Sequence, residues 1–315
     1  MTDKSRILAA DADGIAAAAA VLRAGGIAAV PTETVYGLAA RADDGAAVAR
    51  IYEAKQRPGF NPLIVHVSGA VQAQTLVHVS PLAAQLMAAF WPGPLTLVLP
   101  RLAGAPVADL VSAGLPTLAL RCPAHPVMQA LIAAVGPLAA PSANASGRIS
   151  PTSAAHVDAS LGEDVGLILD GGPSAAGLES TIIAVENDAW TLLRPGAVPA
   201  EAIAAIAGPG RSVQGAAPAI TAPGMLASHY APSQPVRLGA LTASASEFHV
   251  GFGSITGDAN LSPTGDLTEA AARLFALLHE AQASGRPAIA VAPIPHHGLG
   301  AAINDRLRRA AAPRV

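Results

Sequence analysis

The residues with the clearest chemical capacity in this sequence are two cations, Lys55 and Arg57, placed directly before Pro58. The chain has 17 arginines and only two lysines, so a lysine inside a dense motif is informative. Proline removes a backbone donor and stiffens the turn that follows. Cations on such a turn suit a polyphosphate, because arginine can bind two oxygens at once and lysine acts as a point charge. The alternative is that the pair only complements the dipole at a helix end.

Hydroxyl side chains form a second cluster, in the segment PTETVYGL. Thr32, Thr34 and Tyr36 follow the apolar run Ile27–Val30, which predicts a short strand. These hydroxyls either cap a helix or recognise a small polar ligand at the strand ends, where α/β folds place their sites. His66 ends a further apolar run. A lone histidine there is more often a satisfied core residue, but it also adds capacity to bind a small zwitterion.

Two later clusters lie after predicted strands. The segment PSANASG at residues 141–147 gathers small hydroxyl and amide side chains, which either bind an anion or only form a turn. Glu179 and two hydroxyl residues form the other cluster, and Arg194 precedes Pro-Gly at the next strand end. Together with Arg121, the four clusters predict a site for a nucleotide and a small molecule.

Composition excludes several classes of protein. The net charge of −3, with 3% aromatic residues, argues against a broad nucleic-acid surface, which needs a basic excess. No stretch of about 20 residues has the apolar character of a membrane helix, and residues 1–14 lack the pattern of a signal peptide. A single cysteine, Cys122, allows no disulfide framework. We therefore expect a cytoplasmic protein with no membrane contact and no strong direct binding to nucleic acid.

Apolar periodicity predicts strands alternating with helices, which indicates an α/β sheet. Residues 207–235 are rich in Gly, Pro, Ala and Ser and predict a linker, with a second, smaller α/β unit after it. The expected helices are 13–23, with Asp13 as N-cap, 46–55, 81–90, 126–135, 267–283 and 299–312, and the expected strands are 27–30, 63–67, 95–99, 117–121, 138–141, 165–169, 180–185, 190–193, 236–238, 247–252 and 288–291.

The motifs PTETVYGL, KQRP, NPLIVHV, SANASG, SPT, ESTII and RPG, in this order and spacing, resemble the Sua5/YrdC family over residues 15–205. Residues 222–232 and 298–310 resemble the lid and the end of the C-terminal domain in its long form. The resemblance implies a YrdC-like twisted open sheet with flanking helices at 1–206, a Pro/Gly-rich linker and lid at 207–235, and a Rossmann-like α/β domain at 236–315.

The resemblance also implies an activity. The family's long members are L-threonylcarbamoyladenylate synthases, which are nucleotidyltransferases. They convert ATP, L-threonine and bicarbonate into threonylcarbamoyl-AMP, pyrophosphate and water for the t6A37 modification of tRNA. The implied partner is a downstream threonylcarbamoyl transferase complex that acts on tRNA. Such chemistry needs neutralised phosphates and aligned reactants more than a protein nucleophile.

Residue roles follow from the same resemblance. Lys55 and Arg57 would be catalytic. The expected ATP ligands are Lys55, Arg57, Asn61, Ser142, Asn144, Ser150, Arg194 and, from the lid, Tyr230 with His229 beside it. The expected threonine ligands are Thr34, His66, Arg121 and Ser180, with Thr117 and Thr181 as second choices.

Two features are less well specified by the motifs. Mg2+ is expected with ATP, but no metal-binding residues are assigned, and Glu33 and Glu179 are the nearest candidates. The lid segment Leu226–Ser228 is uncharged where typical family members are more basic.

Two alternatives remain open. One is an RNA-binding module of this fold without synthase chemistry, and the other is a carbamoyl-handling protein related to hydrogenase maturation, whose Cys-rich fingers are absent here.

Overall fold

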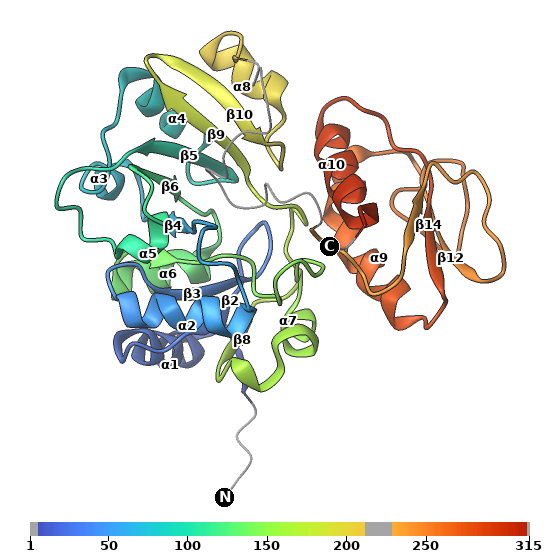
Figure 1. Ribbon diagram of the computed structural model, residues 1–315, viewed down its shortest axis with the longest axis horizontal. Helices are drawn as coiled ribbons and strands as arrows, with labels where there is room; N and C mark the ends of the chain where they lie inside the picture. The colour runs from blue at the N-terminus through green and yellow to red at the C-terminus, as the bar shows by residue number, and fades with distance from the viewer. Residues whose placement is uncertain (1–5, 212–228, 314–315) are drawn as a thin grey trace, which may run out of the picture.

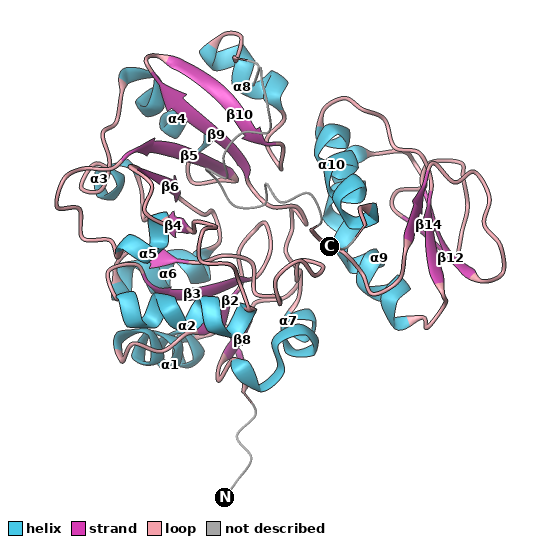
Figure 2. Ribbon diagram, in the orientation of Figure 1, coloured by secondary structure: helices cyan, strands magenta, loops and turns pink. Residues whose placement is uncertain are grey.

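The computed structural model describes residues 6–211 and 229–313, and this part of the chain forms two sheets (Figures 1 and 2). The larger sheet has ten strands in the order β1-β8-β2-β3-β7-β4-β6-β5-β9-β10, with parallel and antiparallel neighbours. Its strands are β1 Ile7–Ala9, β2 Ala28–Val30, β3 Gly37–Arg41, β4 Ile64–His66, β5 Leu95–Pro100, β6 Thr117–Arg121, β7 Leu138–Ala139, β8 Ile168–Asp170, β9 Thr181–Glu186 and β10 Ala189–Arg194.

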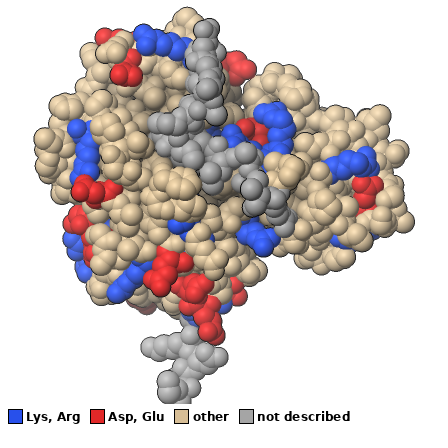
Figure 3. Space-filling model, in the orientation of Figure 1, with Lys and Arg blue, Asp and Glu red and all other residues tan. Residues whose placement is uncertain are grey.

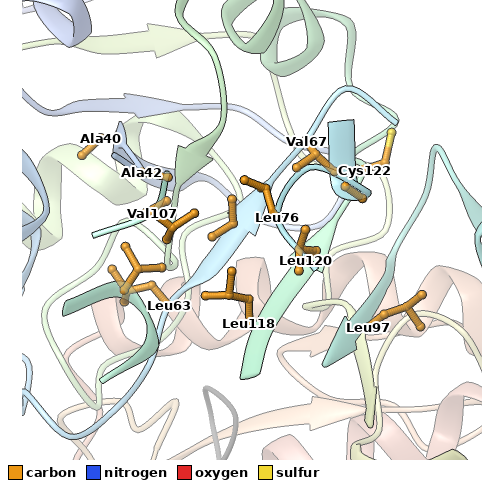
Figure 4. Close-up of a cluster of buried hydrophobic side chains, with 14 of the residues drawn as sticks. Ala40, Ala42, Leu63, Val67, Leu76, Leu97, Val107, Leu118, Leu120 and Cys122 are labelled. Carbon is orange, nitrogen blue, oxygen red and sulfur yellow. The ribbon is translucent and has the colours of Figure 1, made fainter. Parts of the chain in front are cut away.

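Both faces of this sheet are buried, as the side chains of β3 show. Leu38 and Ala40 join one apolar cluster, whereas Ala39 between them joins another, because successive strand residues point to opposite faces. Figure 4 shows part of the first cluster, in which Cys122 packs among aliphatic side chains. The helices that accompany the sheet are α1 Ala12–Arg23, α2 Gly45–Lys55, α3 Ala70–Ala73, α4 Pro81–Phe90, α5 Asp109–Ser112, α6 Pro126–Val135, α7 Ala154–Leu161 and α8 Ala200–Ala207.

The smaller sheet has the order β11-β14-β12-β13, and all its neighbouring strands are parallel. Two helices accompany it, and Figure 1 shows them between this sheet and the larger unit. An all-parallel sheet with crossover helices matches the expected Rossmann-like unit. Its elements are β11 Val236–Leu238, β12 Glu247–Gly251, β13 Ala259–Asn260, α9 Leu267–Ala283, β14 Ala288–Val291 and α10 Leu299–Ala311.

The two units share an apolar cluster. Val35, Ile149 and Leu178 come from loops of the larger unit, and they cluster with Phe275 of α9 and with Tyr230. The chain also passes very close to α9 at Gly177, whose φ is +65°. A Cβ atom at this position would lie 2.5 Å from the carbonyl oxygen of Ala271. The second unit is therefore packed directly against the loops that follow the strands of the first.

Several local predictions need correction. Helix α1 begins at Ala12, and its N-cap is Asp11, whose carboxylate accepts from the amide of Gly14, so Asp13 is not the cap. Strand β3 is not predicted from the sequence, because Gly37–Arg41 directly follows a turn and three of its five residues are Gly or Ala. Two further elements that the sequence pattern does not predict are the short helices α7 and α8.

Part of the predicted linker lies outside the described residues. Helix α8 ends at Ala207 and β11 begins at Val236, whereas residues 212–228, which include the uncharged Leu226–Ser228, are not described. The domain boundaries at 206 and 235 therefore stay predictions. Within residues 6–211 and 229–313, no helix is long and apolar enough to cross a membrane.

Candidate active site

A pocket lies where β4 and β6 end and β9 begins. Its lining includes Thr34, Arg57, His66, Arg121, Ser142, Glu179, Ser180, Arg194, His229 and Tyr230. Parallel strands place their carboxyl ends at one edge of a sheet, which explains why His66 and Arg121, the last residues of the parallel pair β4 and β6, are register partners. The cavity volume is about 50 Å³, well below the roughly 300–1,000 Å³ of most small-molecule sites. The pocket in this form is therefore too small for a ligand of nucleotide size.

Arg121 lines one end of the pocket, and its exposed fraction is 4%. One terminal nitrogen donates to the Thr34 hydroxyl at 2.8 Å, and the other lies 2.6 Å from a carboxylate oxygen of Glu33. Burial alone would raise the pKa of Glu33, but the charge and hydrogen bond of Arg121, together with main-chain hydrogen bonds, lower that pKa overall. This end presents a fixed guanidinium beside a hydroxyl group, which suits an amino-acid carboxylate and its side chain.

His66 is 3% exposed beside this guanidinium. Burial, reinforced by the charge of Arg121, lowers its pKa to about 3, so the ring is neutral near pH 7. Its Nδ1 atom is buried and makes no hydrogen bond to any described residue. A buried polar atom without a partner is costly, so this nitrogen is available to a hydroxyl or amine of a bound molecule.

Arg57 lines the pocket, whereas Lys55 does not, and the cationic groups of both residues donate to main-chain carbonyls. The Lys55 ammonium donates to the carbonyl of Ser142 at 2.5 Å and to that of Asn144, and Arg57 donates to the carbonyl of Pro62 at 2.9 Å. Burial lowers the pKa of Lys55 well below its usual value, with a further contribution from Arg57, and burial lowers the pKa of Arg57 to about 10. Lys55 therefore anchors the loop at residues 142–144, whereas Arg57 itself lines the pocket.

Arg194 and Ser180 also line the pocket. The guanidinium of Arg194 donates to the Ser180 carbonyl at 2.9 Å and to its hydroxyl at 3.2 Å, and that hydroxyl also lies 2.7 Å from the Thr96 hydroxyl. Burial is the main cause of the lowered pKa of Arg194, which Tyr230 partly opposes. Arg57, Arg121 and Arg194 thus bring three buried guanidinium groups to one pocket.

Two amide side chains near the cations have polar atoms without a hydrogen-bond partner among the described residues. Asn61 is 1% exposed, and neither its Nδ2 nor its Oδ1 atom has a hydrogen-bond partner among the described residues. The Oδ1 atom of Asn144 has none either, although its Nδ2 donates to two main-chain carbonyls. Such atoms next to cations suit a polar ligand such as a nucleotide.

His229 and Tyr230 close the pocket from the end of the linker. The two rings meet at 4.2 Å in an edge-on arrangement, and the Tyr230 hydroxyl is buried without a partner among the described residues. Tyr230 has a left-handed backbone conformation with φ of 61°, which is strained for a residue with a side chain. The Arg306 guanidinium lies 5.0 Å from the centre of its ring.

Six of the predicted residues do not line the pocket, namely Lys55, Asn61, Asn144, Ser150, Thr117 and Thr181. Thr117 begins β6, four residues and about 13 Å along the strand from Arg121. The Thr181 hydroxyl donates to the Val198 carbonyl and accepts from its amide, so it holds the chain together. The Ser150 hydroxyl donates to Glu179 at 2.5 Å, so it reaches the pocket through this carboxylate.

The two nearest candidates for holding Mg2+ are both engaged in ion pairs. Glu33 is paired with Arg121, and Glu179 is paired with Arg306 at 2.8 Å. Within the described part of the chain, no group of three or more His, Cys, Asp or Glu side chains could hold a metal ion. The donor set present therefore does not supply a metal cage of its own.

Sequence reasoning missed Arg306, which is fully buried and contacts two residues that line the pocket, Glu179 and Tyr230. The segment around it, GLGAAINDRLRRA, was considered only as the end of a domain. A sequence signal existed, because an arginine on the apolar face of an amphipathic helix requires a buried partner.

The fold and the pocket define an α/β ligand-binding protein whose buried cations suit an anionic substrate. A protein-family model described as "Telomere recombination" (Sua5, YciO and YrdC) matches residues 20–196, and one described as "Threonylcarbamoyl-AMP synthase, C-terminal domain" matches residues 198–312. The chain belongs to the Sua5/YrdC family, among its two-domain threonylcarbamoyl-AMP synthases.

Full-length relatives support this assignment. The threonylcarbamoyl-AMP synthase of Bacillus subtilis is 41% identical over 96% of this chain and 94% of its own, and that of Pyrococcus abyssi is 40% identical over 95% and 94%. A crystal structure described as P. abyssi Sua5 complexed with L-threonine has a TM-score of 0.85, with 38% identity and 94% of each chain covered. A structure of a doubly substituted variant of the same P. abyssi protein also has a TM-score of 0.85, with 38% identity.

Proposed function

We propose that this site joins L-threonine, bicarbonate and ATP into threonylcarbamoyl-AMP. The threonine amine and bicarbonate form a carbamate with loss of water. A carbamate oxygen then bonds to the α-phosphorus of ATP, and the bond to the pyrophosphate oxygen breaks, so pyrophosphate leaves. The observation that carries the proposal is the convergence of Arg57, Arg121 and Arg194 on one pocket, because two anionic reactants must be brought together there.

Threonine is assigned to the Arg121 end. The guanidinium can bind its carboxylate, while the unpartnered Nδ1 of His66 and the Thr34 hydroxyl suit its hydroxyl or amine. A relative with 38% identity is described as complexed with L-threonine, which supports this substrate. Of the predicted threonine ligands, Ser180 is retained because it lines the pocket. Thr117 and Thr181 are not retained.

ATP is assigned to the opposite end, against Arg57, Asn61 and Arg194. Lys55 contributes by holding the loop that carries Ser142 and Asn144. Mg2+ would be supplied with ATP as part of the substrate, since magnesium commonly binds through phosphate oxygens and few protein ligands. It supplies charge neutralisation at the phosphates, while the guanidinium groups of the chain bind and orient them.

The proposal includes the fate of the product. Threonylcarbamoyl-AMP would pass to a transferase complex that modifies A37 of tRNA, and the use of ATP and tRNA supports a cytoplasmic location. The RNA-binding module is less favoured. On the face shown in Figure 3, basic side chains are scattered among acidic ones over the described residues, instead of forming a continuous basic area.

The deciding experiment measures pyrophosphate release from the full chain with ATP, bicarbonate and one amino acid at a time. Release that requires threonine, bicarbonate and Mg2+ together is expected, and a series with serine and other amino acids gives the specificity. Release without threonine would refute the proposed reaction. A tRNA titration at several salt concentrations tests the alternative of an RNA-binding module. That alternative predicts submicromolar affinity for tRNA at physiological salt and no release of pyrophosphate.

A further inference from the structure

We propose that Arg306, in the C-terminal domain, is a positioning residue for the ATP end of the site: it fixes the Glu179 carboxylate and the Tyr230 ring that line the pocket. The inference rests on the proposed function for the identity of the nucleotide. It assigns a role to a residue 127 positions away from Glu179 in the chain.

The first contact runs through Glu179. The Nε atom of Arg306 donates to one oxygen of this carboxylate at 2.8 Å, and the hydroxyl of Ser150 donates to the other at 2.5 Å. The exposed fraction is 0% for Arg306, 6% for Glu179 and 0% for Ser150. A carboxylate held from both sides cannot rotate, so the face that Glu179 turns toward the pocket is set by Arg306.

The second contact is with the lid. The Arg306 guanidinium lies 5.0 Å from the centre of the Tyr230 ring, a distance at which a buried cation is attracted to an aromatic face. Tyr230 has a strained backbone conformation, with φ of 61°. An attractive partner beneath the ring offsets this strain and favours the position in which Tyr230 covers the pocket.

Arg306 also forms an ion pair with an acidic residue of its own helix, α10. Asp305 accepts from Arg306 at 2.7 Å and from Arg309 at 3.1 Å, and Asp305 is 7% exposed. The Nη2 atom of Arg306 makes no hydrogen bond to the described residues. A planar fork with donors in fixed directions suits this bridging position, and the point charge of lysine does not.

A third contact from the C-terminal domain reaches the same loop. His279 of α9 lies with its Nε2 atom 3.2 Å from the carbonyl oxygen of Ser150. Arg306, through Glu179, and His279 therefore hold Ser150 by its side chain and its main chain respectively. Neither residue lines the pocket, so Arg306 acts through Glu179 and Tyr230.

The experiment compares Arg306→Met and Arg306→Lys with Arg308→Met, a control on the same helix whose side chain is 60% exposed. Binding of a non-hydrolysable ATP analogue and of threonine is measured by calorimetry on the full chain, with thermal unfolding in parallel. Arg306→Met is expected to weaken analogue binding tenfold or more and to change threonine affinity less than twofold. Arg306→Lys is expected to fall between wild type and Arg306→Met, and Arg308→Met to match wild type.

Equal loss of both affinities, or unchanged analogue affinity, would overturn the proposal in favour of a structural role. If Arg306→Met does not fold, Glu179→Gln provides the second test. It keeps an acceptor for Ser150 but weakens the pair with Arg306, and selective loss of analogue affinity is again required. Wild-type pyrophosphate release is assayed separately. Its absence would refute the proposed reaction while leaving the binding comparison valid.

Discussion

The Nζ atom of Lys55 lies 2.5 Å from the main-chain carbonyl oxygen of Ser142, 87 residues later in the chain. It also donates to the carbonyl of Asn144, so one ammonium group joins the end of α2 to the loop after β7. The motif alone assigned this lysine to phosphate. The structure gives it a further task, which is to fix the shape of a loop that carries predicted ATP ligands.

The first prediction follows from this anchor. Lys55→Met should weaken ATP affinity at least tenfold, because the loop at residues 142–144 loses both hydrogen bonds, each to a charged donor and worth about 1.5–3 kcal/mol. The Michaelis constant for ATP in pyrophosphate release is the measurement. Arg50→Met, an exposed cation on the same helix, is the control and should match wild type. Normal ATP affinity in Lys55→Met would contradict the assigned role.

Asn61 gives the second prediction. Its side chain makes no hydrogen bond within the described residues, so Asn61→Ala should change the free energy of unfolding by less than about 1 kcal/mol. ATP affinity should fall roughly 10- to 100-fold if the amide binds a charged phosphate. Chemical denaturation and calorimetry measure the two effects.

The control for this test is Asn304→Ala in α10. The Nδ2 atom of Asn304 donates to the carbonyls of Ile294, Pro295 and Gly300. This variant should lose stability, because three carbonyls lose a partner, and keep most of its ATP affinity. A reversed pattern, with Asn61→Ala unstable and fully able to bind ATP, would remove Asn61 from the site.

The third prediction concerns the contact between the two units. Gly177→Ala places a methyl group against the carbonyl oxygens of Ala271 and Ala272, so the C-terminal domain must shift. We expect faster hydrogen exchange in α9 and α10 and weaker ATP binding. Gly172→Ala is the matched control, because its φ is also positive, at 78°, but its Cβ meets no atom within 4 Å. Identical behaviour of the two variants would show that backbone strain alone is responsible.

The fourth prediction is a dependence of stability on pH. Burial, with a smaller effect of His156, lowers the pKa of His279 to about 4, against an ordinary value near 6.5. Between these values the unfolded chain binds a proton that the folded chain does not. The free energy of unfolding therefore rises with pH across this window, by at most about 1.4 kcal/mol per pH unit for this group.

Chemical denaturation of wild type and His279→Phe from pH 4.5 to 7.5 tests this dependence. In the variant, the free energy of unfolding should depend less steeply on pH, by an amount that corresponds to at most one proton. His66, whose pKa is lowered to about 3, contributes to the pH dependence of both proteins. Equal slopes would show that His279 is not held neutral at the interface.

The fifth prediction concerns removal of residues 222–315. The truncated chain should be much slower in synthesis, because Tyr230, Arg306 and His279 are all lost. It should also aggregate more readily, since Val35, Ile149 and Leu178 lose their apolar cover. Pyrophosphate release and light scattering measure the two effects, and full activity in the truncated chain would refute any role of the second domain in closing the site.

Local sequence was sufficient for much of the fold. Helices α4 and α6 and strand β6 have the predicted bounds, because proline begins each helix and apolar side chains are continuous along the strand. The motif order also placed Arg57, Arg121 and Arg194 at one site. Contacts between distant segments could not be predicted from the sequence. No local pattern shows that Lys55 reaches residues 142–144, or that Arg306 reaches Glu179.

The apolar cluster shared by the two units has a consequence for how the chain unfolds. Val35 and Leu178 belong to it together with Phe275 and Leu278 of α9, so neither unit has a complete hydrophobic core of its own in this region. Calorimetry should show coupled melting with a single dominant transition. The catalytic machinery and the second domain are then one cooperative unit, and mutations that loosen α9 lower the population of competent enzyme even when every substrate ligand is intact.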